Sequence, residues 1–190
     1  MGKIEERLDK ILDIIKEDNF LKNRGIGNEI GFYIFDYEPK HEGIVRKHTE
    51  FLIKQMKKIK PDVGILNISI YDIILEILQE KKLLDKCFDM EKKKGKEALH
   101  KAMKPIVKPE AVIDKIKAAY DENTHKLVFL TGIGSAWPLV RSHTILNNLH
   151  HVFDKIPLVA FFPGMYDCKE LRLFGLIKDD NYYRAFQLVK

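Results

Sequence analysis

Residues 126–135, Lys-Leu-Val-Phe-Leu-Thr-Gly-Ile-Gly-Ser, join a short run of apolar and β-branched residues to a glycine-rich turn. An apolar run of this length, bounded by turn residues, is typical of a strand that is covered on both faces. Pro138 follows where it suits the first turn of a helix, and we expect that helix to continue to about His151. The stretch therefore predicts a buried strand followed by a crossover helix.

The same pattern recurs along the chain. Short apolar runs predict three further strands, at 32–37, 63–68 and 157–162, the last ended by Pro163-Gly164. Apolar residues at three- and four-residue spacing predict helices at 3–17, 41–60, 70–81 and 109–120. Strands that alternate with helices require crossover connections and hence parallel pairing. We predict a three-layer α/β fold, with a largely parallel sheet of four or five strands and helices on both faces.

The remaining segments complete this organisation. Leu171 to Ile177 is predicted as an edge strand, and Asp180 to Leu188 as a closing helix. Ser69 is placed to cap the helix that follows it. No composition shift divides the chain, so we predict one α/β domain over 1–190, with 83–121 as a candidate helical insertion.

Composition excludes several classes of protein. Of the 190 residues, 45% are apolar and 32% charged, as expected of a soluble globular chain. We find no secretory leader and no stretch of about 20 apolar residues that would predict a membrane span. Cys87 and Cys168 lie far apart and fit neither a disulfide framework nor a zinc site. We expect a cytoplasmic protein without membrane contact.

The net charge of +5 is confined to one segment. Residues 91–120 hold nine lysines and no arginine against four acids, while the rest of the chain sums to zero. A solvated helix face explains such a run, whereas a nucleic-acid surface usually adds arginine and stacking aromatics. Any contact with DNA is expected to be indirect, but a DNA-binding alternative remains for the lysine cluster at Lys92, Lys93, Lys94, Lys96, Lys101 and Lys104.

Ligands in open parallel sheets collect beyond the carboxyl ends of the strands. Gly132 and Gly134 lie at such an end, where glycines let backbone N–H groups approach a phosphate, although the same glycines suit a tight structural turn. The dinucleotide pattern is incomplete and no Walker A loop occurs. We find no catalytic constellation, metal-ligand set or cofactor motif. The candidate pocket residues are Asp36, Gly132, Gly134, Arg141, His143 and Asp167.

Two polar clusters are candidates for interaction with a partner. Asn147 and Asn148 lie within a predicted helix, where asparagine is unfavourable unless its amide has a partner. A second cluster sets charge beside tyrosines, and tyrosine and arginine are enriched at interface hot spots. Its members are Asp180, Asn181, Tyr182, Tyr183 and Arg184.

Four stretches together resemble the BrxB family of bacteriophage-exclusion (BREX) defence systems. They are GNEIGFYIFDY, LVFLTGIGSAWPLVRSHTILNNLH, PLVAFFPGMYD and LRLFGLIKDDNYYRAFQLV, in that order. The resemblance extends from residue 4 to 189, with 83–121 as the variable part. It implies a role in restricting phage, alongside a PglZ-type phosphatase-like protein, a DNA methyltransferase and a large ATPase. It supplies no catalytic residues.

The leading functional hypothesis is a non-catalytic assembly or adaptor subunit that binds the PglZ-type protein and other BREX subunits. One alternative is a nucleotide- or anion-binding enzyme or sensor, with its pocket at the carboxyl ends of the strands. A second is a DNA-binding accessory protein that uses the lysines of 92–104.

Overall fold

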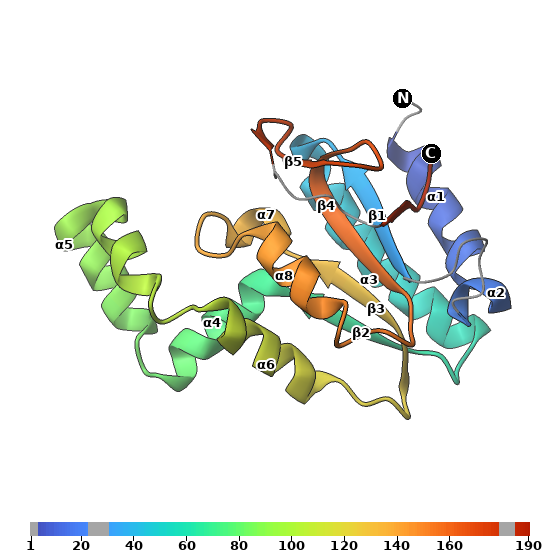
Figure 1. Cartoon of the computed structure of the whole chain (residues 1–190), viewed down its shortest axis with the longest axis horizontal. Helices are drawn as coiled ribbons and strands as arrows, with labels where there is room; N and C mark the ends of the chain where they lie inside the picture. Colours follow the sequence, from blue (N-terminus) through green and yellow to red (C-terminus); the bar gives the residue numbers. More distant parts are fainter. Residues whose placement is uncertain (1–3, 23–30, 179–184) are drawn as a thin grey trace.

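Five parallel strands run through the centre of the part of the chain that the structure, a computed structural model, describes: residues 4–22, 31–178 and 185–190 (Figure 1). Their order in the sheet is β2-β3-β4-β1-β7. Neighbours pair in parallel throughout this path. The strands are β1 (Phe32–Tyr37), β2 (Gly64–Ser69), β3 (His125–Thr131), β4 (Leu158–Tyr166) and β7 (Phe186–Gln187). The predicted α/β class and the predicted parallel sheet are confirmed.

Helices cover both faces of this sheet, because successive side chains of a strand point to opposite sides. Phe35 and Phe161 face one side, where α1 (Ile4–Ile15) and α3 (Glu42–Ile59) pack. Ile34 and Ala160 face the other. That second side is covered by α4 (Ile70–Glu80), α6 (Pro109–Ala119) and α8 (Ser142–Leu149) (Figure 1). The shorter helices are α2 (Asp18–Leu21), η1 (Pro39–His41) and α7 (Ile133–Ala136).

Local sequence signals place most element ends correctly. Ser69 precedes α4, and its hydroxyl oxygen accepts a hydrogen bond from the backbone N–H of Asp72 at 3.3 Å. Pro109 lies in the first turn of α6, where its missing N–H breaks no helical bond. Pro39 opens η1 directly after β1. Capping and proline positions thus fix where strands give way to helices.

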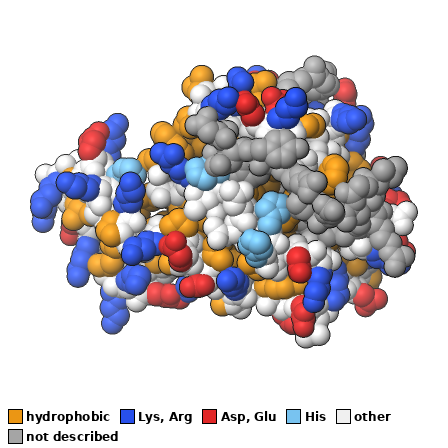
Figure 2. Space-filling view, in the orientation of Figure 1, with side chains coloured by type: hydrophobic (Ala, Val, Ile, Leu, Met, Phe, Trp, Pro, Cys, Tyr) orange, Lys and Arg blue, Asp and Glu red, His pale blue; other side chains and the backbone are white. Residues whose placement is uncertain are grey.

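The long helix α5 (Leu84–Met103) projects away from the sheet (Figure 1). Gly95 interrupts it with φ 80°, and Met103 is its one fully buried residue. By contrast, α6 packs Val112, Ile113 and Ile116 into the core. In Figure 2 lysine side chains lie around the α5 end, interspersed with acidic and apolar ones. The proposed insertion at 83–121 and the single domain over 1–190 stay predictions, since α5 and α6 differ in how they contact the core.

The helix expected from Pro138 to His151 is wrong in its first part. Residues 133–136 form the single turn α7, Trp137 is extended with ψ 139°, and α8 begins only after Arg141. The residue before a proline is disfavoured in helical conformation, so Pro138 ends one helix and does not start the next. Arg141 is the extended N-cap residue of α8.

The expected end of the fourth strand at Pro163-Gly164 is also wrong, because β4 continues to Tyr166. Pro163 pairs with the last residue of β1, and its carbonyl accepts a hydrogen bond from Phe174 N at 2.8 Å. β4 therefore pairs with the parallel β1 as far as Pro163 and with the antiparallel β5 from Gly164 to Tyr166. At Gly164 a Cβ would lie 2.1 Å from the Arg172 carbonyl oxygen, so only glycine admits this strand.

The last part of the chain departs furthest from expectation. The single edge strand predicted over 171–177 is a hairpin of β5 (Leu171–Leu173) and β6 (Ile177–Lys178). It turns at Phe174 and Gly175, which have positive φ. The helix predicted to end at Leu188 is contradicted by β7, which pairs with the free edge of β1. The start predicted for that helix lies outside the described residues.

Two partly buried histidines make stability depend on pH. Burial lowers the pKa of His48 and of His150, whose ring lies 3.9 Å from that of Phe32. The folded state therefore disfavours a proton that the unfolded state accepts near pH 6.5. We expect the free energy of unfolding to fall as the pH is lowered from 7.5 to 5.5. Urea unfolding of the wild type and of His48→Gln/His150→Gln measures this, and an equal loss in both would contradict it.

Candidate functional site

A polar cavity of about 520 Å³ lies at the carboxyl ends of β2 and β3. It opens where α3 leaves β1 toward one face of the sheet while α4 and α7 leave their strands toward the other. Such a switch in direction forms the crevice in which open α/β sheets bind ligands. The position agrees with the rule that named the carboxyl ends as the candidate site.

One wall of the cavity is the first half of α3. The hydroxyl of Tyr37 donates a hydrogen bond of 2.6 Å to Glu42 Oε2. The other oxygen of that carboxylate lies 3.5 Å from the Arg46 guanidinium, one helical turn further on. Burial raises the pKa of Tyr37, and the carboxylate beside it adds to the effect. The phenol therefore stays protonated and holds Glu42 in place.

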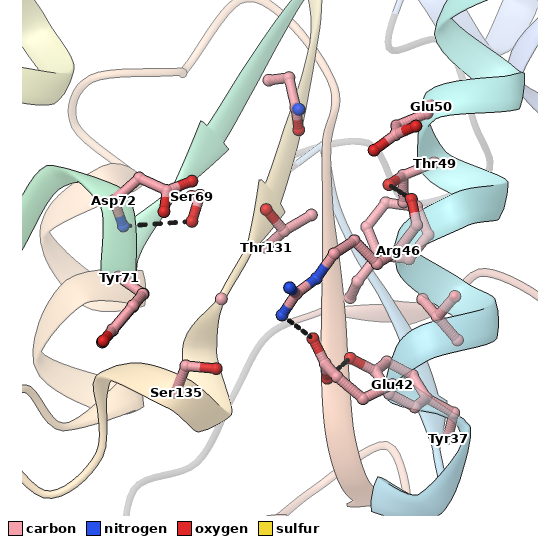
Figure 3. A pocket seen from close by; sticks show the side chains of 14 residues that line it. Tyr37, Glu42, Arg46, Thr49, Glu50, Ser69, Tyr71, Asp72, Thr131 and Ser135 are labelled. Carbon is pink, nitrogen blue, oxygen red and sulfur yellow. Dashed lines mark hydrogen bonds and ion pairs between the residues drawn. The ribbon is translucent and has the colours of Figure 1, made fainter.

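The floor and the opposite wall carry short polar side chains. Asn67, Ser69 and Thr131 come from the ends of β2 and β3, and Asp72 and Ser135 come from the helices that follow. Figure 3 shows Ser69 and Asp72 on the far side of the cavity from Arg46 and Glu50, with Thr131 between them. Six separate elements, β1, α3, β2, α4, β3 and α7, thus bring polar groups to one cavity.

Of the six predicted pocket residues, the structure places only Gly132 at this cavity. Gly132 has φ 69°, and a Cβ there would lie 2.8 Å from Ser69 Oγ. At Gly134 a Cβ would meet Pro163 and Phe174 at 2.8 and 3.0 Å. The first glycine lets α7 approach the start of α4, and the second lets the β5–β6 hairpin pack against α7. Both contacts explain the glycines by packing.

Asp36 lies in a buried ion pair. Its Oδ1 is 2.8 Å from an Arg7 nitrogen, and its Oδ2 accepts a hydrogen bond from Tyr166 N at 3.2 Å. Arg7 also donates to the backbone oxygens of Asp36 and Val189, and its guanidinium lies 4.8 Å from the Phe35 ring centre. This network joins α1, β1, β4 and the residues after β7. Its contacts make Asp36 a stabilising residue of the core.

The other predicted pocket residues lie at two further places. Arg141 and His143 line a cavity of about 160 Å³ together with Trp137 and Lys178. Asp167 is exposed, and its Oδ1 accepts hydrogen bonds from the N–H groups of residues 169 and 170. These bonds lower the pKa of its carboxyl. Asp36 and Asp167 both line a cavity of about 300 Å³, and the other candidate residues lie elsewhere.

The predicted interaction residues are only partly described. Asn147 and Asn148 are exposed on α8. The side-chain amide of Asn148 donates a hydrogen bond of 2.7 Å to the Thr144 carbonyl, one turn earlier. That bond supplies the partner that an asparagine within a helix needs. The second cluster, 180–184, lies outside the described residues.

An exposed apolar surface lies beside Arg141. Leu176, at the turn of the β5–β6 hairpin, is 85% exposed, and Met165 and Trp137 are 54% and 42% exposed. The Trp137 and Phe174 rings meet edge to face at 6.1 Å. We name Trp137, Met165, Phe174 and Leu176 the hairpin surface. Sequence reasoning missed it because its residues converge only through the hairpin.

Similarity to known proteins extends over most of the chain, the hairpin surface included. Residues 66–188 match the family model described as "BREX protein BrxB". The chain belongs to the BrxB family. A BrxB from Bacillus cereus (strain H3081.97) is 50% identical over 193 aligned residues, covering 100% of this chain and 99% of that protein. A BrxB from Escherichia coli O9:H4 (strain HS) is 39% identical over 186 residues, covering 98% and 92%.

Membership of BrxB gives the protein a role in the BREX phage-defence system. No solved structure matches the chain significantly. Among the described residues, no helix is long and apolar enough to cross a membrane. Within the same residues, no three His, Cys, Asp or Glu side chains form a group suited to a metal ion.

Proposed function

We propose that the protein is a non-catalytic assembly subunit of a cytoplasmic BREX complex, and that it binds a PglZ-type partner through the hairpin surface. The observations that support this are the exposure of Trp137, Met165 and Leu176 and the position of the first two against the hairpin: the Trp137 ring contacts Phe174, and Met165 Sδ lies 4.0 Å from where a Cβ of Gly175 would be. Exposed apolar patches rimmed by polar residues mark interaction sites. Three of the four stretches that carry the family resemblance meet there, 127–150, 157–167 and 171–178.

The rim of the hairpin surface is basic. Arg141 and Lys178 line the small cavity beside Trp137, and Arg172 is exposed on β5. Lys178 and Arg172 both contact Glu170, at 2.9 and 3.5 Å, so the rim keeps a net positive charge. An aromatic and aliphatic centre with an arginine rim is the usual composition of a protein interface. We expect the partner to present acidic residues around an apolar pocket.

The test is co-purification of the tagged protein with the PglZ-type partner. We expect Leu176→Asp combined with Trp137→Ala to weaken the complex at least tenfold, since truncating a central interface residue costs about 2 kcal/mol or more. Ile59→Asp is the matched control, because Ile59 is a 49% exposed aliphatic residue on α3. Thermal melting of each variant confirms that the fold is retained.

A complex that survives both substitutions at the hairpin surface would contradict the proposal. In a second arm, Tyr183→Ala/Arg184→Ala tests the interaction residues predicted from sequence. If only this variant loses the complex, the binding residues are those of 180–184, and the hairpin surface is not the binding site.

A further inference from the structure

We propose that the cavity at the carboxyl ends of β2 and β3 binds a linear organic cation, such as a polyamine, with its ammonium groups held between Glu50 and Asp72. The proposal is independent of the assembly role, because the cavity and the hairpin surface share none of their residues.

The dimensions and position of the cavity suit a small molecule. Its volume of about 520 Å³ lies within the range of about 300–1,000 Å³ that small-molecule sites occupy. It lies at the switch in crossover direction, the usual ligand crevice of such sheets. Phe161 and Val45 give it an apolar base among the polar groups. An alkyl chain finds contacts there that a hydrated metal ion does not.

Several polar groups of the cavity have unused hydrogen-bonding capacity. Within the described part of the chain, the side chains of Asn67 and Ser135 make no hydrogen bond, and the carboxylates of Glu50 and Asp72 make no ion pair. All four are exposed to the cavity side or to solvent. They offer oxygen acceptors for the N–H groups of a ligand at no cost to existing contacts.

The charged side chains that line the cavity repel an anion. Three carboxylates, those of Glu42, Glu50 and Asp72, face a single cation, Arg46, which already lies against Glu42. A phosphate could bind at the N-terminus of a helix, and the nearest long helix at this cavity is α4. Its first turn carries the carboxylate of Asp72, which repels an anion there. The nucleotide- or anion-binding alternative is therefore disfavoured at this cavity.

The same charges select the ligand class. Glu50 on α3 and Asp72 on α4 stand on opposite walls, so two positive groups joined by an alkyl chain can satisfy both (Figure 3). The floor hydroxyls accept the remaining ammonium hydrogens. Free polyamines and lysine side chains of another protein share this chemistry, and a test must separate the two sources.

Isothermal titration of the full chain with spermidine tests the proposal. We expect saturable 1:1 binding, weakened about fivefold by Glu50→Gln or Asp72→Asn and about twenty-five-fold by both, as for exposed ion pairs that act independently. Glu110→Gln, an exposed acid on α6, is the matched control and leaves the affinity unchanged. A trilysine peptide forms the second arm.

Tighter binding of spermidine than of trilysine supports a free polyamine, and the reverse supports a lysine side chain of a partner. Absence of saturable binding by either probe overturns the proposal. So does equal weakening by Glu110→Gln, or full displacement by Mg²⁺ at equal ionic strength, since both indicate unspecific charge attraction. Loss of co-purification with the partner has no bearing on these readouts, so the two proposals fail separately.

Discussion

Replacing Asp36 by alanine lowers the free energy of unfolding by about 3–5 kcal/mol, because it leaves the Arg7 guanidinium buried without its counter-charge. Only 10% of the Arg7 side chain and 4% of the Asp36 side chain are exposed. Tyr166 N loses an acceptor in the same change. With a total stability of about 5–15 kcal/mol for a typical domain, this is a large fraction. Urea unfolding followed by circular dichroism measures it.

Two further variants, one at an unrelated exposed acid and one that removes both charges, separate the causes of this loss. Asp114→Ala removes an exposed carboxylate on α6 and should change stability by less than about 0.5 kcal/mol. Arg7→Met/Asp36→Leu removes both charges and should recover much of the loss, because no unpaired ion remains. An Asp36→Ala protein within about 1 kcal/mol of the wild type would show that the pair is not needed.

Phe161→Ala is expected to cost about 3–5 kcal/mol, since it opens a cavity at the centre of one core layer. Phe161 is 1% exposed, meets the Phe129 ring edge to face at 5.3 Å and lies 5.9 Å from Phe35. It also forms part of the base of the polar cavity. The substitution therefore affects stability and the shape of that cavity together.

The controls for Phe161 are a conservative change and an exposed phenylalanine. Phe161→Leu keeps most of the volume and should lose less than half as much stability. Phe88→Ala truncates a side chain that is 54% exposed on α5, and should remain within about 0.5 kcal/mol of the wild type. Comparable losses at Phe88 and Phe161 in urea unfolding would contradict the assigned burial.

Elements whose side-chain period is set locally could be predicted from sequence. The buried strand at Leu127–Leu130 and the helices α3, α4 and α6 have regular apolar spacing, and Ser69 caps α4 while Pro109 opens α6. The central sheet and its parallel pairing follow from their alternation. Local periodicity and capping were therefore enough for the class of the fold.

Elements that depend on distant partners could not be predicted. Pro163 continues a strand because Phe174, eleven residues later, donates to its carbonyl. Residues 186 and 187 form a strand because the edge of β1 is free to pair with them. Asp36 has the position of a ligand-binding acid at a strand end, but Arg7 of α1, 29 residues earlier in the chain, lies against it. None of these partners is visible in the local pattern.

The sequence predicted where a cavity would lie, but not most of the residues that line it. The rule for parallel sheets pointed to the carboxyl ends of the strands, where the cavity lies, but half of the residues that line it come from α3 and the start of α4. A signal was present: Glu42 and Arg46 stand one turn apart at the start of the helix after the first strand, a spacing that favours an ion pair.

The hydrogen bond from Arg7 to the Val189 carbonyl, 3.1 Å long, has a consequence for biosynthesis. A ribosome releases α1 and β1 long before residues 186–189 emerge, and domains fold as they are synthesised. Until then the edge of β1 is unpaired, one acceptor of Arg7 is missing, and Leu188 and Val189 do not yet cover the core. The nascent protein therefore exposes a sheet edge to chaperones until residues 186–189 have emerged.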